Sequence, residues 1–268
     1  RQRAVLHADE TPVQQLDPKA KLGGTKKAYL WAYRSNTLDG KDPIVVFDYQ
    51  TSRAGQHARD FLQDWQGYLV VDDYAGYKAL FNGKVTEVGC WAHVRRKFFE
   101  LQVANQSPMA SEALRRIGLL YEIEQRGKAL AVTERQKLRQ AESVPVLSSL
   151  LDWLIEQVRV IAPNSGMAKA LSHAIKRWSS LVVYAQSGDI PIDNNPVENC
   201  IRPIALGKKN WLFAGSERAG CRAAAIQSLL ATAKLNGLEP LAWLTSTLEK
   251  LPTWPNSRID ELLPLRSS

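Results

Sequence analysis

The sequence of 268 residues predicts a mixed α/β fold. Short apolar runs rich in aromatic and β-branched residues dominate the part before Cys90, which is typical of strands. After Cys90 this signal stops for about a hundred residues, and apolar residues recur at the spacing of helices. A hydrophobic share of 45% is enough to bury a sizeable core. We therefore expect one strand-rich domain with a helical insertion.

The first part of the chain is expected to contain strands and two helices in a definite order. The strands are residues 4–8, 28–33, 43–47, 68–71 and 85–90, and the helices are residues 57–65 and 75–80. The polar stretch between the first two strands predicts a mobile loop or a wide hairpin. This order resembles the ribonuclease H-like fold, in which a three-strand meander is followed by parallel strands with crossovers.

Helices are expected to fill the rest of the chain. Apolar spacing predicts them at residues 92–103, 147–158, 167–184, 219–236 and 241–251. The charged segment 128–142 predicts either an exposed helix or a partly ordered arm. Before the last two helices, the turn chemistry around residue 193 predicts another helix, with Asp193 or Asn194 as its cap and Glu198 in its first turns.

Charge and cysteine content limit the classes of protein. Lys and Arg number 35 against 27 Asp and Glu, a net charge of +8, which favours a polyanionic partner because neutralised phosphates release counterions. A basic enzyme without nucleic acid is the alternative. No apolar run reaches the ~18 residues of a membrane span, so no membrane partner is expected. Three cysteines suit a reducing cytoplasm, and the start at Arg1 predicts a piece of a longer protein.

Three acidic residues stand where a divalent cation could bind. Asp9 ends the first apolar run, Asp72 ends the fourth, and Glu198 begins a helix. Carboxylate oxygens are the ligands that Mg²⁺ and Mn²⁺ prefer, and two such ions ~3.5–4 Å apart support displacement at a phosphodiester. Each acid also has a simpler explanation: an Asp after a strand forms turns or caps helices, and Glu198 could pair with Arg202.

Neighbouring acids leave two of these assignments open. Four apolar residues lead directly to Asp72, but a slip of one residue in strand register would favour Asp73. Glu10 is a weaker competitor for Asp9.

Six phrases of the sequence carry a family resemblance. They are His7-Ala-Asp9-Glu-Thr, Val71-Asp72-Asp-Tyr-Ala-Gly-Tyr, Cys90-Trp-Ala-His93-Val-Arg-Arg-Lys-Phe, Asp193-Asn-Asn-Pro-Val-Glu198-Asn-Cys-Ile-Arg202-Pro, Lys208-Lys-Asn-Trp-Leu-Phe-Ala-Gly-Ser-Glu217 and Leu229-Leu-Ala-Thr-Ala-Lys-Leu-Asn-Gly-Leu-Glu-Pro240. In this order, over essentially the whole chain, they resemble the IS66 family of bacterial insertion-sequence transposases. The resemblance implies a DDE transposase catalytic domain with a ribonuclease H-like core and a large α-helical insertion between the second and third acidic residues.

The resemblance also implies a division of the chain and a reaction. Residues 1–90 would form the first part of the core, 91–190 the insertion, 191–227 the core helix with the third acid and a basic segment, and 228–268 a C-terminal element. Asp9, Asp72 and Glu198 would bind two Mg²⁺ or Mn²⁺ ions. Metal-dependent strand cleavage and strand transfer would then move the insertion sequence, without a covalent protein intermediate.

Three other functions remain open from the residues alone. They are a ribonuclease H-like nuclease that does not join strands, a non-catalytic DNA-binding transposon remnant, and a basic interaction protein without metal. The expected partners of a transposase are double-stranded DNA, as transposon ends and as target, and further copies of the chain in a homodimer or larger assembly.

Seven residues are expected to contact DNA: His93, Arg95, Arg96, Arg202, Lys208, Lys209 and Trp211. The basic residues would bind phosphates, and Trp211 would stack on an unpaired base unless it is buried in the core. Further candidates for phosphate contacts are Lys97, Lys176, Arg177, Arg218 and Arg222. His93 could instead pack in the core, and the two-residue gap between Cys90 and His93 is also that of half a zinc site.

Overall fold

The computed structural model describes residues 2–17, 19–20 and 24–266, except for the side chains of Lys208 and Lys209. Two compact units make up the chain. The core unit consists of Arg1–Gly67, Tyr74–Lys84 and Pro196–Ser268, and the helical unit consists of Tyr68–Asp73 and Val85–Asn195.

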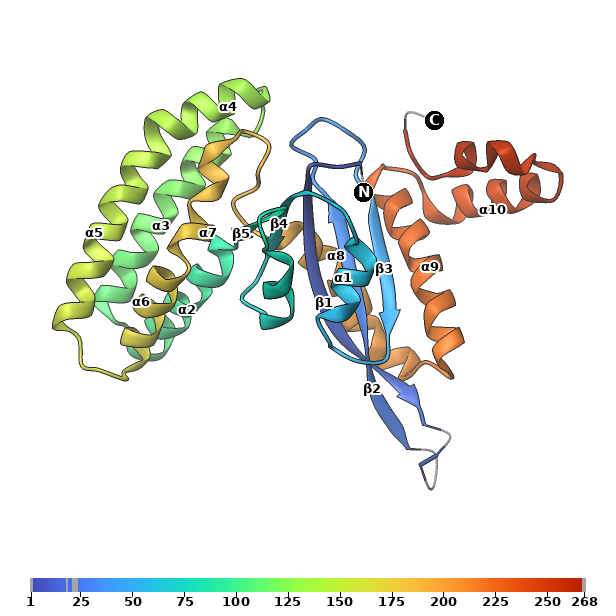
Figure 1. Ribbon diagram of the computed structural model, residues 1–268, viewed down its shortest axis with the longest axis horizontal. Coiled ribbons are helices and arrows are strands. Elements are labelled where there is room, and N and C mark those ends of the chain that lie inside the picture. The colour runs from blue at the N-terminus through green and yellow to red at the C-terminus, as the bar shows by residue number, and fades with distance from the viewer. Residues whose placement is uncertain (1, 18, 21–23, 267–268) are drawn as a thin grey trace. The chain divides into compact units, whose positions relative to one another are not determined.

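The strands form one sheet in the order β3-β2-β1-β4-β5. Their bounds are β1 Val5–Leu16, β2 Thr25–Ser35, β3 Val45–Gln50, β4 Gly67–Val71 and β5 Val85–Gly89. β1 pairs with β2 and β2 with β3, both antiparallel, which makes the three-strand meander seen in Figure 1. This strand order, combined with the helices that follow, confirms the predicted α/β class with a ribonuclease H-like core.

β1 is longer than the strand that the sequence predicts. Its pairing with β2 continues to Leu16 opposite Thr25, which favours the wide hairpin, and residues 18 and 21–23 of the polar stretch lie outside the described residues. Polar residues after Asp9 are part of this longer strand, and one of them, Gln15, is buried and accepts a hydrogen bond at Oε1 from the Tyr49 hydroxyl at 2.9 Å. The prediction that Asp9 ends its strand is therefore wrong, and Asp9 lies well inside β1.

Helix α8 (Asn195–Trp211) packs against the meander. Val197, Ile201 and Ile204 are buried in one cluster with residues of β1, β2 and β3. Their spacing of four and three residues puts them on one face of the helix. Because Glu198 directly follows Val197, the packing of this face also fixes where the Glu198 side chain leaves the helix.

Helix α9 (Glu217–Leu235) covers the outer edge of the sheet at β3. The Phe47 amide donates to Ser228 Oγ at 2.7 Å, and the Val45 amide donates to Thr232 Oγ1 at 3.2 Å. Two residues along a strand span ~6.6 Å and four residues along a helix span ~6 Å, so the two hydroxyls match the two outward amides.

The helical unit contains the helices that lie between the second and third acids. They are α2 Trp91–Asn105, α3 Pro108–Gly127, α4 Val132–Leu138, α5 Val144–Val160, α6 Gly166–Lys176 and α7 Trp178–Leu181. Within this unit, α2 and α5 each pack against both α3 and α6 (Figure 1). The predicted large insertion is thus confirmed. The core unit adds α1 (Gln56–Leu62) and α10 (Pro240–Lys250).

None of the described helices combines the length and the apolar character that crossing a bilayer requires.

The charged segment 128–142 is mostly helical, which agrees with the helix alternative, but the helix is not exposed all round, because Arg135 and Arg139 are buried. A π-helical turn, Arg139–Ser143, follows α4, and the Arg139 side chain is fully buried. Its Nε and Nη2 atoms donate to the two Glu124 carboxylate oxygens at 2.8 and 2.6 Å. Its Nη1 atom donates to the carbonyl oxygens of Tyr184 and Ile190, each at 2.8 Å. Arg139 therefore fixes the segment that leads to α8.

The helix predicted over residues 167–184 is interrupted. It consists of α6, α7 and a short 3₁₀ helix Val183–Gln186, with the first break at Arg177. Arg177 lies at this break, and its guanidinium binds groups outside the helix, as described below.

We predict that Arg139→Leu lowers the free energy of unfolding by about 3 kcal/mol, because the substitution leaves the largely buried Glu124 carboxylate without its partner. Chemical denaturation followed by circular dichroism measures this change. Arg115→Leu is the control, since Arg115 forms an exposed ion pair with Glu112 and its loss should change stability little. Equal, small effects of both substitutions would contradict the structural role of Arg139.

Candidate functional site

Asp9 lies on β1 opposite Ala32 of β2 and is half-buried. Its Oδ1 atom accepts a hydrogen bond from the backbone amide of Glu10 at 2.8 Å. Successive residues of a strand point to opposite faces of the sheet, so Asp9 and Glu10 cannot serve the same site from this strand.

Glu10, the alternative to Asp9, is bound to other residues of the core unit. Its side chain is only 1% exposed and forms an ion pair with Arg53, Nη2 to Oε1, at 2.5 Å. The Tyr77 hydroxyl donates to its Oε2 atom at 2.9 Å. Burial, and secondly the Glu10 charge, raise the pKa of Tyr77 well above its ordinary value, so Tyr77 remains a donor. These contacts favour Asp9 as the metal ligand.

Asp72 directly follows β4, as predicted, and is half-buried. The neighbouring Asp73 binds Arg177, with Oδ1 at 2.7 Å from Nη1. The same Nη1 atom lies 2.7 Å from Glu87 Oε1, and Nη2 donates to the Asp72 carbonyl oxygen at 3.3 Å. Arg177 thus pairs with the Asp73 carboxylate, whereas it binds only the backbone carbonyl of Asp72. Because the Asp73 carboxylate is already paired with an arginine, these contacts favour the Asp72 carboxylate as the candidate metal ligand.

The prediction that Arg177 contacts phosphate is wrong. Its side chain is 7% exposed and is shared between two carboxylates of the helical unit. His173 Nδ1 lies 3.6 Å from Asp73 Oδ2. Burial, and next the charge of Lys97, lower the pKa of His173 to about 4 against the opposing effect of Asp73, so His173 is neutral near pH 7.

Glu198 lies in the first turn of α8, which confirms its predicted position. The segment just before it is fixed by three contacts within the helical unit. Asp193 Oδ1 accepts from the Asn195 amide at 3.1 Å, and Asp193 Oδ2 accepts from the Tyr121 hydroxyl at 3.1 Å. The Asn194 amide donates to Cys90 Sγ at 3.2 Å. Residues 193–195, which lead into α8, are therefore held within the helical unit by α3 and by the residue that precedes α2.

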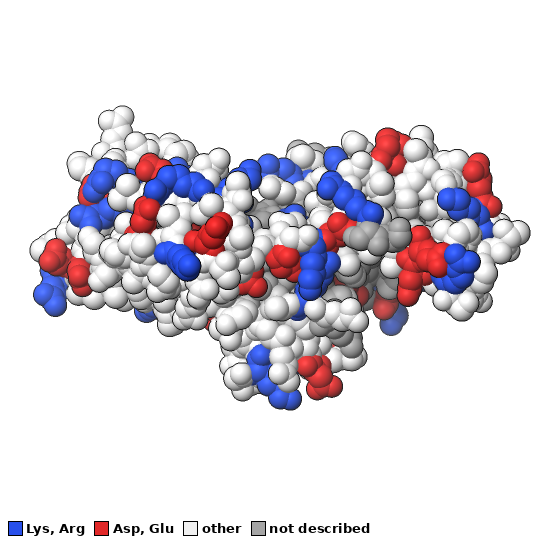
Figure 2. All heavy atoms as spheres, turned by 90° about the horizontal axis from the view of Figure 1, so that it is seen from above, with Lys and Arg blue, Asp and Glu red and all other residues white. Residues whose placement is uncertain are grey.

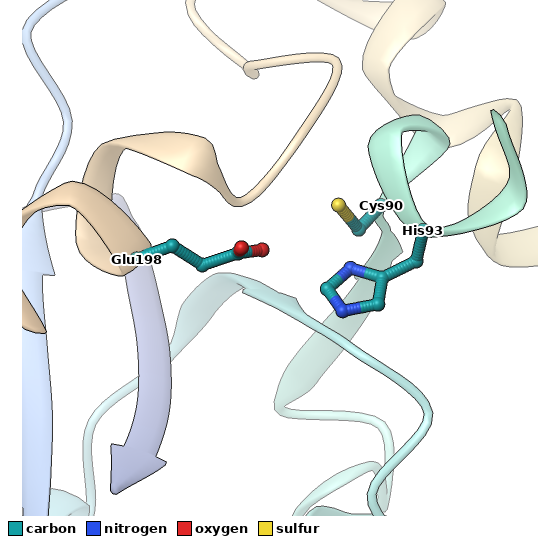
Figure 3. A group of neighbouring side chains, drawn as sticks. All are labelled: Cys90, His93 and Glu198. Carbon is teal, nitrogen blue, oxygen red and sulfur yellow. The ribbon is translucent and has the colours of Figure 1, made fainter. Parts of the chain in front are cut away.

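Figure 3 shows Cys90 and His93 at the start of α2, and Glu198 at the start of α8. Cys90 is buried, at 3% exposure, and its bond with the Asn194 amide gives it a structural role. His93 is half-buried. Its role at DNA and the alternative zinc site both stay predictions.

Arg95 and Arg96 are exposed on α2. They border an open pocket of about 790 Å³ in the helical unit, which Phe99 of α2, Tyr121 of α3 and Asn195 also line. Phe99 is 47% exposed. The pocket therefore combines two cationic groups and an accessible aromatic ring with one carboxylate, that of Glu100.

The other predicted DNA contacts lie on α8. Arg202 is exposed, and Trp211 is 43% exposed, so the alternative that Trp211 belongs to the core is wrong. The side chains of Lys208 and Lys209 lie outside the described part of the structure. On the face drawn in Figure 2, basic and acidic side chains are interspersed.

Sequence reasoning missed Arg53, Tyr74 and Tyr77 as residues around the site. The two tyrosines belong to the phrase that begins at Val71, and this phrase was the available signal. Nothing local marked Arg53, because its partner Glu10 is 43 residues away.

Comparison with known proteins gives one family over nearly the whole chain. Residues 1–222 match the model described as "Transposase IS66 family", and residues 228–265 match the IS66 C-terminal element. The chain is 35% identical to the uncharacterized protein y4qI of Sinorhizobium fredii strain NGR234 over 97% of its own length. It is 32% identical to y4hP of the same strain, also over 97% of its length. In both comparisons, it spans about half the length of the relative.

These matches bear out the resemblance that the six phrases carry, including the C-terminal element. The chain belongs to the IS66 family of transposases, and its matched regions are the family's DDE transposase domain and C-terminal element.

Proposed function

We propose that this domain cleaves DNA strands and joins them to a target during transposition of a bacterial insertion sequence. Asp9, Asp72 and Glu198 would be its metal-binding and catalytic residues. Membership of a DDE transposase family is the observation that carries the proposal. The position of each acid on its own element supports it: Asp9 on β1, Asp72 after β4 and Glu198 in the first turn of α8.

The chemistry of these three residues fits Mg²⁺ or Mn²⁺. All three offer carboxylate oxygens, the donors that hard divalent cations prefer. The strand order makes β1 and β4 neighbours, so two of the acids come from adjacent strands. Asp9 and Asp72 each have an acidic neighbour in sequence that forms an ion pair with an arginine. Glu10 pairs with Arg53, and Asp73 pairs with Arg177. When bound, two such ions supply positive charge to the attacking and leaving oxygens of a phosphodiester.

The reaction proceeds in two displacements at phosphorus. In the first, a water oxygen attacks the phosphodiester at a transposon end, the bond from phosphorus to the 3′ oxygen breaks, and that oxygen leaves as a 3′-OH. In the second, this 3′-OH attacks a phosphodiester of the target, and the 3′ oxygen of the target strand leaves. The three carboxylates orient the groups, and no bond forms to the protein.

DNA would be held by exposed residues of α2 and α8. Arg95, Arg96 and Arg202 would bind phosphates, as would Lys208 and Lys209. Trp211 would stack on an unpaired base and His93 would contact the scissile strand. Two transposon ends and a target require several DNA segments at once, which supports a homodimer or a larger assembly on DNA.

We predict that Asp9→Asn, Asp72→Asn and Glu198→Gln each reduce cleavage by roughly a thousandfold or more, since each removes several kcal/mol of transition-state stabilisation. A labelled transposon-end duplex incubated with target DNA and Mn²⁺ reports cleavage and joining together. The exposed Asp64→Asn is the control and should stay active.

Two results of this assay would favour other functions. Cleavage by the wild type without joined products, when paired ends are supplied, would favour a nuclease without strand transfer. Absence of cleavage together with absence of Mn²⁺ binding would favour a non-catalytic remnant.

We predict that Asp72 and Asp73 respond oppositely to amide substitution. Asp72→Asn should abolish Mn²⁺ binding and leave stability nearly unchanged. Asp73→Asn should retain Mn²⁺ binding and lower the melting temperature modestly, because Arg177 loses one of its two carboxylates. Isothermal titration with Mn²⁺ and thermal unfolding measure both effects. The reverse pattern would assign the metal to Asp73.

We predict that Arg95→Ala and Arg96→Ala weaken binding of all duplex sequences alike. Each lost phosphate contact should reduce the slope of log affinity against log salt by about 0.9. Fluorescence anisotropy at a series of salt concentrations measures the slope. Arg115→Ala is the matched control, because Glu112 already neutralises Arg115 on the neighbouring helix α3. If the slope is unchanged from the wild type in both α2 variants, Arg95 and Arg96 do not contact DNA phosphates.

A further inference from the structure

The Glu10 carboxylate is a buried junction between three segments of the core unit. Arg53 donates to its Oε1 atom from both Nε, at 2.7 Å, and Nη2, at 2.5 Å. The Tyr77 hydroxyl donates to its Oε2 atom at 2.9 Å. Both oxygens therefore bind donors, one from the segment after β3 and one from the 3₁₀ helix Ala75–Leu80.

The two donors are themselves connected. The Arg53 guanidinium lies over the Tyr74 ring, 3.8 Å from its centroid, and the Tyr74 hydroxyl donates to the Arg53 carbonyl oxygen. The Tyr74 and Tyr77 rings meet edge to face at 5.8 Å, and Tyr77 packs in the same way on Trp31 at 5.7 Å. Contacts thus run in a closed circuit from Glu10 through Arg53, Tyr74 and Tyr77 back to Glu10.

Two glycines allow this circuit to close. A Cβ atom on Gly76 would lie 2.2 Å from the Tyr74 ring, and one on Gly55 would lie 2.1 Å from the Gly76 carbonyl oxygen. Neither distance is compatible with a side chain. The segment that follows Asp72 and Asp73 can therefore approach the segment after β3 only because both positions are glycine.

Glu10 is connected to Asp9 by a direct hydrogen bond as well as by sequence. The Glu10 backbone amide donates to Asp9 Oδ1 at 2.8 Å. Because side chains alternate along a strand, bonds that fix Glu10 on one face of β1 also fix the direction of Asp9 on the other. Any rotation of β1 at this point would have to break the ion pair of the buried Glu10 carboxylate with Arg53.

We propose that Glu10 is a positioning residue that holds the Asp9 carboxylate in its metal-binding orientation, with Arg53 and Tyr77 acting through it. This inference rests on the proposed metal site. Glu10 itself binds no metal in this proposal. It acts as the outer partners of metal ligands do, whose loss commonly costs about 10–100-fold in metal affinity.

The sharpest test compares two variants, each of which lacks one tyrosine hydroxyl. Tyr77→Phe keeps the ring in place and removes only the hydrogen bond to Glu10. Tyr49→Phe is its matched control, since the Tyr49 hydroxyl bonds to Gln15 at 2.9 Å on the same strand but away from Asp9. Mn²⁺ affinity by titration and melting temperature are measured for both, together with Glu10→Gln and the Glu10→Gln/Tyr77→Phe double variant.

We expect Tyr77→Phe to weaken Mn²⁺ binding by roughly tenfold and Tyr49→Phe to leave it unchanged. Glu10→Gln should weaken it at least as much, and the double variant should fall short of the product of the two single effects, because both act on one carboxylate. Lower melting temperatures in Tyr77→Phe with wild-type Mn²⁺ affinity would overturn the proposal in favour of a purely structural role.

Two further outcomes separate this inference from the proposed function. Loss of Mn²⁺ binding in Glu10→Gln with wild-type affinity in Tyr77→Phe would identify Glu10 as a ligand and overturn the positioning role alone. Absence of Mn²⁺ binding in the wild-type chain would overturn the metal site and this inference together. If Glu10→Gln does not fold, the comparison of Tyr77→Phe with Tyr49→Phe still decides.

Discussion

The antiparallel pairing of β1 with β2 is the constraint on which the proposed site depends most. The pairing runs from Leu6 opposite Ser35 to Leu16 opposite Thr25, so the register is fixed over almost the whole strand. A slip of one residue would exchange the faces of Asp9 and Glu10 and would turn the core side chains of β1 away from α8. One hairpin therefore decides which acid is available for metal and where the helix with the third acid can pack.

Several arginines of the chain bind groups of the protein itself. Arg135, Arg139 and Arg177 are all buried, and each binds carboxylates or backbone carbonyl oxygens of the helical unit. A net charge of +8 counts these together with residues that can reach DNA. The excess positive charge is thus a poor guide to the DNA-binding surface, and exposure together with the absence of an acidic partner in contact is the better criterion for each arginine.

Features set by neighbouring residues were predictable, and features set by distant partners were not. The start of α8 could be placed because its turn and cap residues lie beside Glu198. The fold class followed from strands whose apolar character is intrinsic. By contrast, the contact of Arg177 with Asp73 joins residues 104 positions apart, and the buried Arg139 binds Glu124 and two distant carbonyl oxygens. The contacts that separate Asp9 from Glu10 are equally non-local, so the pattern left both acids open.

The hydroxyls of Ser228 and Thr232 on the outward amides of β3 have a consequence for assembly. An edge strand with unbonded amides can pair with a strand of another chain, and here α9 occupies the place of that strand. Both hydroxyls belong to the C-terminal element, which begins at residue 228. The element thus blocks the addition of a strand at the β3 edge of the sheet, and a chain cut short before Ser228 would expose two amides at this edge, which favours aggregation.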